Sequence, residues 1–163
     1  MEKLNPDEVY AENGEFQVIQ ALRLSRAKRA ERGEIFIEGI QAVKMAARAN
    51  LEITRIILAA SGMAGLSPWG RAFVRANPWA RVLTMADPLY RKLCDRSEPL
   101  ELLVTARKRA LGLGDLRLPR DPFILLFDRP SDAGNLGSTI RSLNAFGGDA
   151  LLILGHGVDP WDP

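Results

Sequence analysis

The chain has 163 residues, enough for one ordinary domain or two small ones, and a formal net charge of only +2. Its hydrophobic content of 47% suits a globular protein, and no apolar run approaches the roughly 20 residues of a membrane span, so we expect no membrane association. Because Cys94 is the only cysteine and the N-terminus lacks the apolar core of a signal peptide, we expect no internal disulfide, no metal site and a cytoplasmic location.

Charge is divided unevenly along the chain. Residues 1–15 carry one lysine and five acids, and we expect this polar segment to be a flexible N-terminus. Residues 16–109 hold 17 lysines and arginines against eight acids, whereas residues 110–163 hold four against seven. Arginine dominates the basic middle block, and it suits bidentate contact with phosphate and stacking on bases. The pattern favours a nucleic acid partner, although a basic surface alone does not establish one.

A helix is predicted from Phe16 to about Arg32, because this segment has no glycine or proline and its apolar residues recur at three-residue spacing. Basic residues form a stripe along the same helix: Arg23, Arg26, Lys28, Arg29 and Arg32. Like charges this close repel one another and favour a counter-charge, so the stripe is a candidate phosphate-binding edge. The alternative is a solvated helix face without a partner, and the sequence leaves both open.

Strands and helices alternate through the rest of the basic block. The predicted strands are 34–38, 53–59, 81–85 and 100–106, and the predicted helices are 39–49, 67–76 and 87–94. Two of the helices open with a cap residue followed by proline, at Ser67-Pro68 and Asp87-Pro88. This order predicts an α/β domain over residues 16–109. Glycines and prolines amid charges then predict a linker at residues 110–122.

The end of the chain is predicted to form a strand, a helix and a second strand. Apolar runs at 123–127 and 150–154 show no polar alternation, which is typical of strands covered on both faces. Between them, Leu136, Ile140 and Leu143 lie at i, i+4 and i+7, so this face of the helix should pack on the sheet.

Two polar residues of this last segment are candidates for a catalytic site. Asn135 is expected in the loop before the helix and Arg141 one to two turns inside it, both near the carboxyl end of the first strand, where open parallel sheets bind ligands. Neither a dinucleotide G-x-G-x-x-G fingerprint nor a P-loop occurs there. The structural alternatives are that Asn135 caps the helix and that Arg141 pairs with Asp128 or Asp132.

The segment D-A-G-N-L-G at 132–137, followed by Arg141 and by A-F-G at 145–147, resembles the first signature motif of the SpoU/TrmH RNA methyltransferases, part of the SPOUT superfamily. Members transfer a methyl group from S-adenosylmethionine to a ribose 2′-hydroxyl of rRNA or tRNA, usually as homodimers. The resemblance implies that Arg141 activates the hydroxyl and that Asn135 orients it. Because arginine stays protonated, we expect Arg141 to hold an RNA phosphate and stabilise the developing alkoxide. Ala133 departs from the family, which usually has proline there.

The basic helix, the F-I-E-G segment at 36–39 and the alanine-rich helix after it resemble the accessory RNA-binding domain of the same enzymes. That domain is similar to a ribosomal-protein fold, so the resemblance makes RNA the expected partner of the basic stripe. The sequence leaves two roles open for Glu38, as a residue at the entry of the helix or as a contact to RNA.

The two resemblances together imply an N-terminal α/β/α RNA-binding domain and then, over residues 123–163, the opening strand, helix and strand of an incomplete SPOUT domain with its trefoil knot. The later family motifs, which build most of the S-adenosylmethionine pocket, do not occur before Pro163. The cofactor-binding residues are therefore unknown, and we expect an inactive N-terminal portion that binds no cofactor and exposes apolar surface. The alternative is a non-catalytic RNA-binding protein that uses the basic domain alone.

Overall fold

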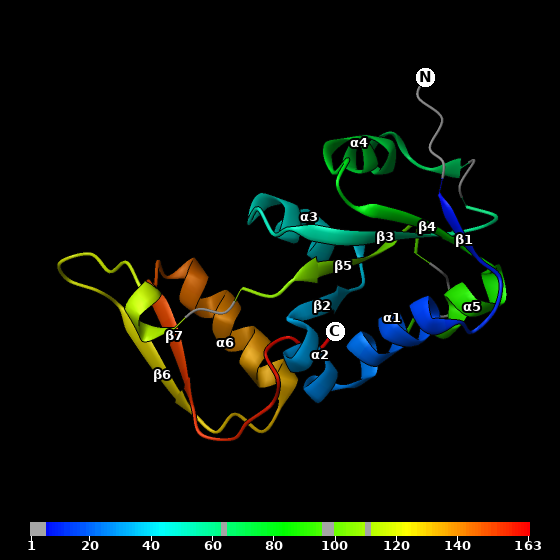
Figure 1. Cartoon of the computed structure of the whole chain (residues 1–163). Coiled ribbons are helices and arrows are strands. Elements are labelled where there is room, and N and C mark those ends of the chain that lie inside the picture. The colour runs from blue at the N-terminus through cyan, green and yellow to red at the C-terminus, as the bar shows by residue number, and fades with distance from the viewer. Residues whose placement is uncertain (1–5, 63–64, 96–99, 110–111) are drawn as a thin grey trace. The chain divides into compact units, whose positions relative to one another are not determined.

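The computed structural model describes residues 6–62, 65–95, 100–109 and 112–163. The chain divides into two compact units, one formed by Met1–Arg109 with Pro163 and the other by Ala110–Asp162 (Figure 1). The division falls where the sequence predicts the start of a linker, and the described part of that linker contains a short 3-10 helix, η2 (Leu113–Asp115). No helix among the described residues is long and apolar enough to cross a bilayer.

The first unit is built on a five-stranded mixed sheet with the order β1-β4-β3-β5-β2 (Figure 1). β4 runs parallel to both of its neighbours, whereas β5 runs antiparallel to both of its own. The strands are β1 (Asp7–Val9), β2 (Glu34–Ile37), β3 (Ile53–Ala59), β4 (Arg81–Met85) and β5 (Leu103–Arg107). All four strands predicted in this region are present.

The fifth strand, β1, lies in the segment predicted to be flexible. It pairs in parallel with β4, with Asp7 opposite Leu83 and Val9 opposite Met85. Val9 is 2% exposed and belongs to the core, while its two strand neighbours are exposed. The prediction of a loose N-terminus is therefore wrong for residues 7–9. An edge strand this short needs only one buried side chain, and the polar composition of the segment concealed it.

Helices cover both faces of this sheet (Figure 1). On one side lie α1 (Gly14–Leu24), α2 (Arg26–Arg32) and α5 (Asp87–Lys92), and on the other lie α3 (Ile40–Arg48) and α4 (Pro68–Ala76). On the first side, apolar residues of α1 and α5 pack on the strands around Ile57, which is fully buried. Ile56 and Leu58 are also fully buried. Because side chains alternate along a strand, these two point to the face of the sheet that α3 and α4 cover. The sheet is thus covered on both faces, as the predicted α/β domain requires.

The helix predicted over residues 16–32 is interrupted at Ser25. Ser25 has extended backbone angles (φ −130°, ψ 112°), and its Oγ accepts a hydrogen bond from the Lys28 amide at 3.3 Å, so Ser25 is the N-cap of α2. Gly33 ends α2 in the left-handed region, with φ 62°. The prediction of one continuous helix is wrong because serine is a strong N-cap residue despite being acceptable inside a helix. The basic residues consequently lie on two helices.

The second unit contains β6 (Ile124–Asp128), α6 (Ala133–Ala145) and β7 (Ala150–Leu154), with β6 and β7 paired in parallel. This confirms the predicted strand, helix and strand. Leu136 and Leu143 are 3% and 8% exposed, but Ile140 is 43% exposed and does not belong to the packed face. The strands are only partly buried, and Leu126 is 61% exposed. The expectation that both faces of these strands are covered is therefore wrong for the described chain, because β6 and β7 form a sheet of only two strands.

Two glycines end α6. Gly147 has φ 73°, its amide donates to the Asn144 carbonyl at 3.2 Å, and the Gly148 amide donates to the Leu143 carbonyl at 2.8 Å. This is the hydrogen-bond pattern of a Schellman motif. A Cβ at Gly148 would overlap the Leu143 side chain, so the turn into β7 requires glycine there.

Candidate functional site

Asp132 is the residue that caps α6. Its Oδ1 accepts a hydrogen bond from the Asn135 amide at 2.7 Å, and its backbone is extended. Asn135 lies inside the first turn of the helix and is exposed, so its predicted loop position is wrong. Its alternative role as the cap is also wrong, because the cap one turn earlier already binds the Asn135 amide. The Asn135 carboxamide is therefore not used to begin the helix.

Arg141 lies two turns further along α6 and is exposed. Its guanidinium lies over Gly137, where an added Cβ would come within 3.3 Å of Nη1. Asp128, one proposed partner, pairs instead with Arg129 at 2.8 Å between Oδ2 and Nη2. Within the described part of the chain, no carboxylate lies at ion-pair distance from Arg141. The structural alternatives for Arg141 are thus not seen.

Asn135 and Arg141 are exposed on different flanks of α6. At 3.6 residues per turn, six residues separate two side chains by about 120° around the axis and about 9 Å along it. Leu136 and Leu143 mark the buried line between the flanks. Helical side chains lean towards the N-terminus, and the position of Arg141 over Gly137 shows that lean. Both candidate groups are therefore presented on the exposed part of one helix, and no contact between them is found in the described chain.

The loops that follow β6 and β7 lie side by side. The Arg129 amide donates to the Leu154 carbonyl at 2.9 Å, and the Val158 amide donates to the Pro130 carbonyl at 2.8 Å. A Cβ at Gly157 would come within 2.7 Å of the Pro130 oxygen, so glycine is needed for this approach. His156, in the same loop, is exposed. These contacts hold the carboxyl edge of the sheet, from which the chain enters α6.

The basic residues near the N-terminus differ in their surroundings. Arg29 is 2% exposed, and its Nη1 donates to the carbonyls of Leu22 and Arg23 at 2.9 and 3.0 Å. Arg29 thus satisfies the last carbonyls of α1, as basic residues often do at helix C-termini. Arg23 is mostly buried and pairs with Asp95. Only three members of the predicted stripe are exposed, and they lie on α2: Arg26, Lys28 and Arg32.

Glu38 fastens a loop on the first unit. Both of its carboxylate oxygens accept from the Asp95 amide, at 3.1 and 3.2 Å. The N-cap of α3 is Gly39, with φ 102° and no side-chain cap. Glu38 thus lies at the entry of α3, directly before its N-cap, but its carboxylate binds the Asp95 amide and does not cap the helix.

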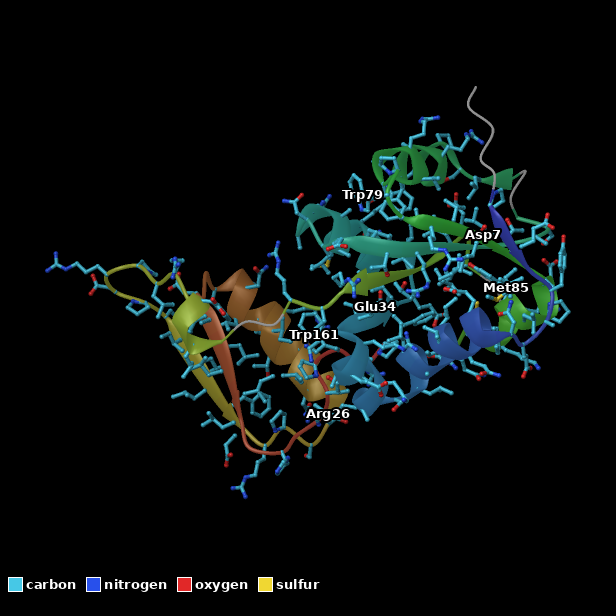
Figure 2. All side chains as sticks on the ribbon, in the orientation of Figure 1. Asp7, Arg26, Glu34, Trp79, Met85 and Trp161 are labelled. Atoms are coloured by element: carbon cyan, nitrogen blue, oxygen red, sulfur yellow. The ribbon has the colours of Figure 1, made fainter. Side chains whose placement is uncertain are left out.

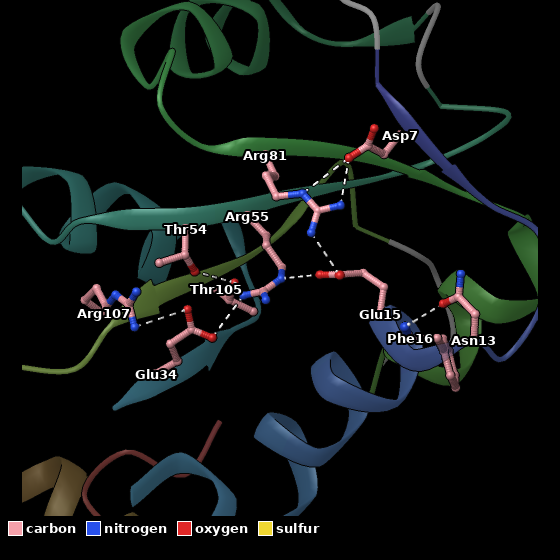
Figure 3. Close-up of polar contacts among 10 residues, drawn as sticks. All are labelled: Asp7, Asn13, Glu15, Phe16, Glu34, Thr54, Arg55, Arg81, Thr105 and Arg107. Carbon is pink, nitrogen blue, oxygen red and sulfur yellow. Dashed lines mark hydrogen bonds and ion pairs between the residues drawn. The ribbon is translucent and has the colours of Figure 1, made fainter. Parts of the chain in front are cut away.

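Sequence reasoning missed a charged network on the sheet of the first unit, at the end of the strands opposite Glu38 (Figure 3). Arg55 donates to Glu15 Oε1 at 2.5 Å and to Glu34 Oε2 at 2.9 Å. Arg81, its partner across β3 and β4, binds Asp7 at 2.8 Å and Glu15 at 2.9 Å. The available signal was Arg55 itself, a charge inside the otherwise apolar strand I-T-R-I-I-L-A. Such a charge is rarely buried without a partner.

The network sets the ionisation of Glu15. Burial raises the pKa of this carboxyl, but the hydrogen bond and charge of Arg55, with a further contribution from Arg81, outweigh burial and hold the pKa below its ordinary value. Glu15 therefore stays ionised and ties the start of α1 to β3 and β4.

A pocket of about 490 Å³ adjoins this network. It is lined by Glu34, Glu52, Ile53, Thr54, Arg55, Trp79, Arg81 and Arg107. Figure 2 marks two of these residues, Glu34 and Trp79, on the first unit. All eight come from the first unit.

Comparison with known proteins identifies relatives of both units. The family model of the SpoU L30e-like domain matches residues 13–104. A 23S rRNA (uridine(2479)-2′-O)-methyltransferase from Streptomyces viridochromogenes is 31% identical over 156 residues, which cover 95% of this chain and 53% of that protein. The crystal structure of the SpoU methyltransferase AviRb from Streptomyces viridochromogenes, in complex with AdoMet, matches with a TM-score of 0.80 and 32% identity over 93% of this chain and 56% of that chain. An rRNA methyltransferase from Sinorhizobium meliloti, 23% identical with a TM-score of 0.78 over 97% of this chain and 58% of that chain, shares the fold.

The chain spans about half the length of the relatives it matches. The family model covers more than half of the chain and lies within the first unit. The structural matches extend through the second unit, which carries the D-A-G-N-L-G motif. The chain therefore belongs to the SpoU/TrmH family of RNA methyltransferases.

Proposed function

We propose that this chain is the N-terminal portion of an S-adenosylmethionine-dependent methyltransferase that modifies a ribose 2′-hydroxyl of rRNA. The observation that carries the proposal is the N-x-G-x-x-x-R pattern on α6, in which Asn135 and Arg141 are both exposed. The name of the Streptomyces viridochromogenes relative supports rRNA as the substrate class.

In this proposal, Arg141 acts as a fixed positive charge. Its guanidinium holds the phosphate next to the target ribose and stabilises the alkoxide that develops on the 2′-oxygen. It is a poor proton acceptor because arginine stays protonated, so the hydroxyl proton passes to the RNA phosphate that Arg141 holds. Asn135 offers one acceptor and two donor hydrogens, which can fix the orientation of the ribose.

S-adenosylmethionine supplies an electrophilic methyl group when it is bound. The buried polar side chains of the described chain all lie in the first unit: Arg29, Glu34, Asn77 and Thr105. The described second unit thus offers no buried polar side chain to such a cofactor. We therefore assign no cofactor-binding residue to this chain. We propose that other parts of the family fold complete the site, in a cytoplasmic homodimer.

RNA would be gripped by the exposed basic residues of α2, which are Arg26, Lys28 and Arg32. Lys28 is partly neutralised by Glu31, whose carboxylate lies 2.7 Å away. Arg23 and Arg29 are left out of this surface because the structure uses them in packing. Charge on this helix should steer RNA through its phosphates, without reading sequence.

The test is mass-spectrometric mapping of ribose methylation in rRNA treated with a protein extended to the length of its relatives. Arg141→Ala should abolish methylation and leave RNA affinity nearly unchanged, while Arg117→Ala, an exposed arginine outside the motif, should keep activity. A fully active Arg141→Ala protein would remove Arg141 from the mechanism.

A non-catalytic RNA-binding protein is the second candidate. It is favoured by the match of the family model to residues 13–104, all within the first unit. The same experiment separates the two, since this alternative predicts RNA binding with no methylated ribose at any length of the protein.

A further inference from the structure

We propose that the pocket at the Glu34 end of the first unit's sheet holds one unpaired nucleotide of RNA, with the base stacked on Trp79 and the phosphate at Arg107. The proposal rests on the proposed function in taking RNA as the ligand. It concerns the end of the sheet opposite Glu38 and Gly39, and no residue of the predicted basic stripe takes part.

The fold brings four strands together at this site. The starts of β2, β3 and β4 and the end of β5 meet at one end of the sheet, because β5 runs antiparallel to β2 and β3. They contribute Glu34, Arg55, Arg81 and Arg107 respectively. The pocket of about 490 Å³ lies within the usual range for small-ligand sites, roughly 300–1,000 Å³, so one nucleotide is a reasonable occupant.

Trp79 lies in the turn between α4 and β4 and is 63% exposed. The turn is held by Asn77, which is buried: its Nδ2 donates to the Phe73 carbonyl at 2.8 Å, and its own carbonyl accepts from the Ala80 amide at 3.0 Å. Trp69, by contrast, is used in packing, stacked on Phe73 with ring centroids 5.2 Å apart. A large aromatic face held at a pocket rim by a fixed turn suits stacking with a base.

Arg107 differs from the other arginines of the pocket. Arg55 is 13% exposed and hydrogen-bonded, and Arg81 is held by two carboxylates. Arg107 is 55% exposed, and its nitrogens lie 3.8 Å from Glu34 and 3.9 Å from Glu52. These distances exceed a hydrogen bond, so the two carboxylates orient the guanidinium while its donors stay available to a phosphate.

Further basic residues lie on the elements that reach this end of the sheet. Arg107 is followed directly by Lys108 and Arg109, and α3 and α4 both end at this end of the sheet with an exposed arginine in the last turn, Arg48 and Arg75. Arginine donors beside an exposed aromatic residue are the combination that binds single-stranded nucleic acid. Such a site would give the protein a grip on an unpaired nucleotide in addition to the phosphate contacts of α2.

The experiment uses the whole 163-residue chain and a fluorescein-labelled nine-nucleotide oligouridylate, which is unstructured. Trp79→Ala should weaken binding roughly tenfold, whereas Trp79→Phe should keep most of the affinity. Arg107→Ala should lower the slope of log affinity against log salt by about 1. Arg91→Ala, which removes an exposed arginine from α5, is the control and should leave the affinity unchanged. Tryptophan quenching on binding should disappear in Trp79→Phe.

Other outcomes overturn the proposal in different ways. If the wild-type chain binds the oligouridylate and all three pocket variants bind it equally well, RNA is held elsewhere. If the chain binds duplex rRNA fragments but not the oligouridylate, the pocket is not a nucleotide site and RNA binding itself stands. If Trp79→Ala changes the oligomeric state and not the affinity, the pocket is a protein interface. If the wild-type chain binds neither RNA, that result would instead contradict the proposed function.

Discussion

The guanidinium of Arg141 lies over Gly137, one turn earlier on α6, and a methyl group at 137 would approach Nη1 to 3.3 Å. Gly137→Ala should therefore shift the guanidinium. The free energy of unfolding should stay the same or rise by up to about 1 kcal/mol, because alanine favours helix over glycine. Methylation by the extended protein should fall by several-fold to roughly 100-fold, since catalysis depends on the position of the charged group. Thermal unfolding and ribose mapping measure the two effects. Gly114→Ala, where an added Cβ meets nothing within 4 Å, is the control. A fully active Gly137→Ala protein would show that this position of Arg141 does not matter.

The network around Arg55 predicts a difference in stability between two arginines. Arg55→Ala leaves the carboxylate of Glu34, which is 7% exposed, without its closest partner. We expect a loss of roughly 3–5 kcal/mol in the free energy of unfolding. Arg81 is 53% exposed, so Arg81→Ala should cost about 1 kcal/mol or less. Urea titration of both variants measures the difference, and equal losses would mean that burial does not decide the strength of these pairs.

Substitutions of Arg29 and Arg32 should distinguish a structural role from a role in RNA binding. Arg29→Ala removes two hydrogen bonds from a buried guanidinium to the end of α1, so about 2 kcal/mol of stability should be lost. Arg32→Ala removes an exposed charge from the last turn of α2 and should cost less than about 1 kcal/mol. RNA binding should respond in the opposite order, with the salt slope reduced by about 1 only in Arg32→Ala. Unfolding curves and filter binding at several salt concentrations test both statements, and a reduced slope in a folded Arg29→Ala protein would contradict them.

The elements that the sequence predicted well are those whose signal is local. β3 and β4 are bounded by breaks in apolar runs, and the motif on α6 is a fixed spacing of side chains. The break at Ser25 was missed because serine fits both a helix interior and a cap, and only the backbone decides between them. The same ambiguity led to the wrong prediction that Asn135 lies in the loop, because aspartate and asparagine are both good N-cap residues and the cap is Asp132.

The pocket could not be predicted for a different reason. Its residues come from four strands and two connecting segments, and they meet only once the strand order is known. Trp79 and Arg107 are 28 positions apart in the sequence, and neither lies in a motif. Pairing of β3 with both β4 and β5 is what brings these parts of the chain to one end of the sheet.

Exposed apolar residues on the second unit confirm the expected apolar surface and predict self-association. Leu126 is 61% exposed on β6 and Phe146 is 80% exposed at the end of α6. Leu126→Glu should reduce association at high protein concentration, because a charge on the strand opposes burial against another copy. Leu24→Glu, at a residue of the first unit that is 66% exposed, is the matched control and should have little effect. Light scattering over a concentration series measures this, and a wild-type chain that remains monomeric throughout would contradict the prediction.

Glu15 predicts how stability depends on pH. Its pKa in the folded chain lies below the ordinary value of 4.5, because Arg55 and Arg81 outweigh the opposing effect of burial. A carboxyl with a depressed folded pKa contributes stability above its unfolded pKa, and that contribution is lost as the pH falls through the folded pKa. Wild type should therefore lose stability below about pH 4.5 more steeply than Glu15→Gln, and the difference between the two should shrink towards pH 3. Glu12→Gln removes a carboxylate that is 51% exposed and controls for the loss of one acid. Urea unfolding at pH 7, 5, 4 and 3 measures the difference, and a gap between wild type and Glu15→Gln that stays constant over this range would show that the ion pairs of Glu15 do not control its ionisation.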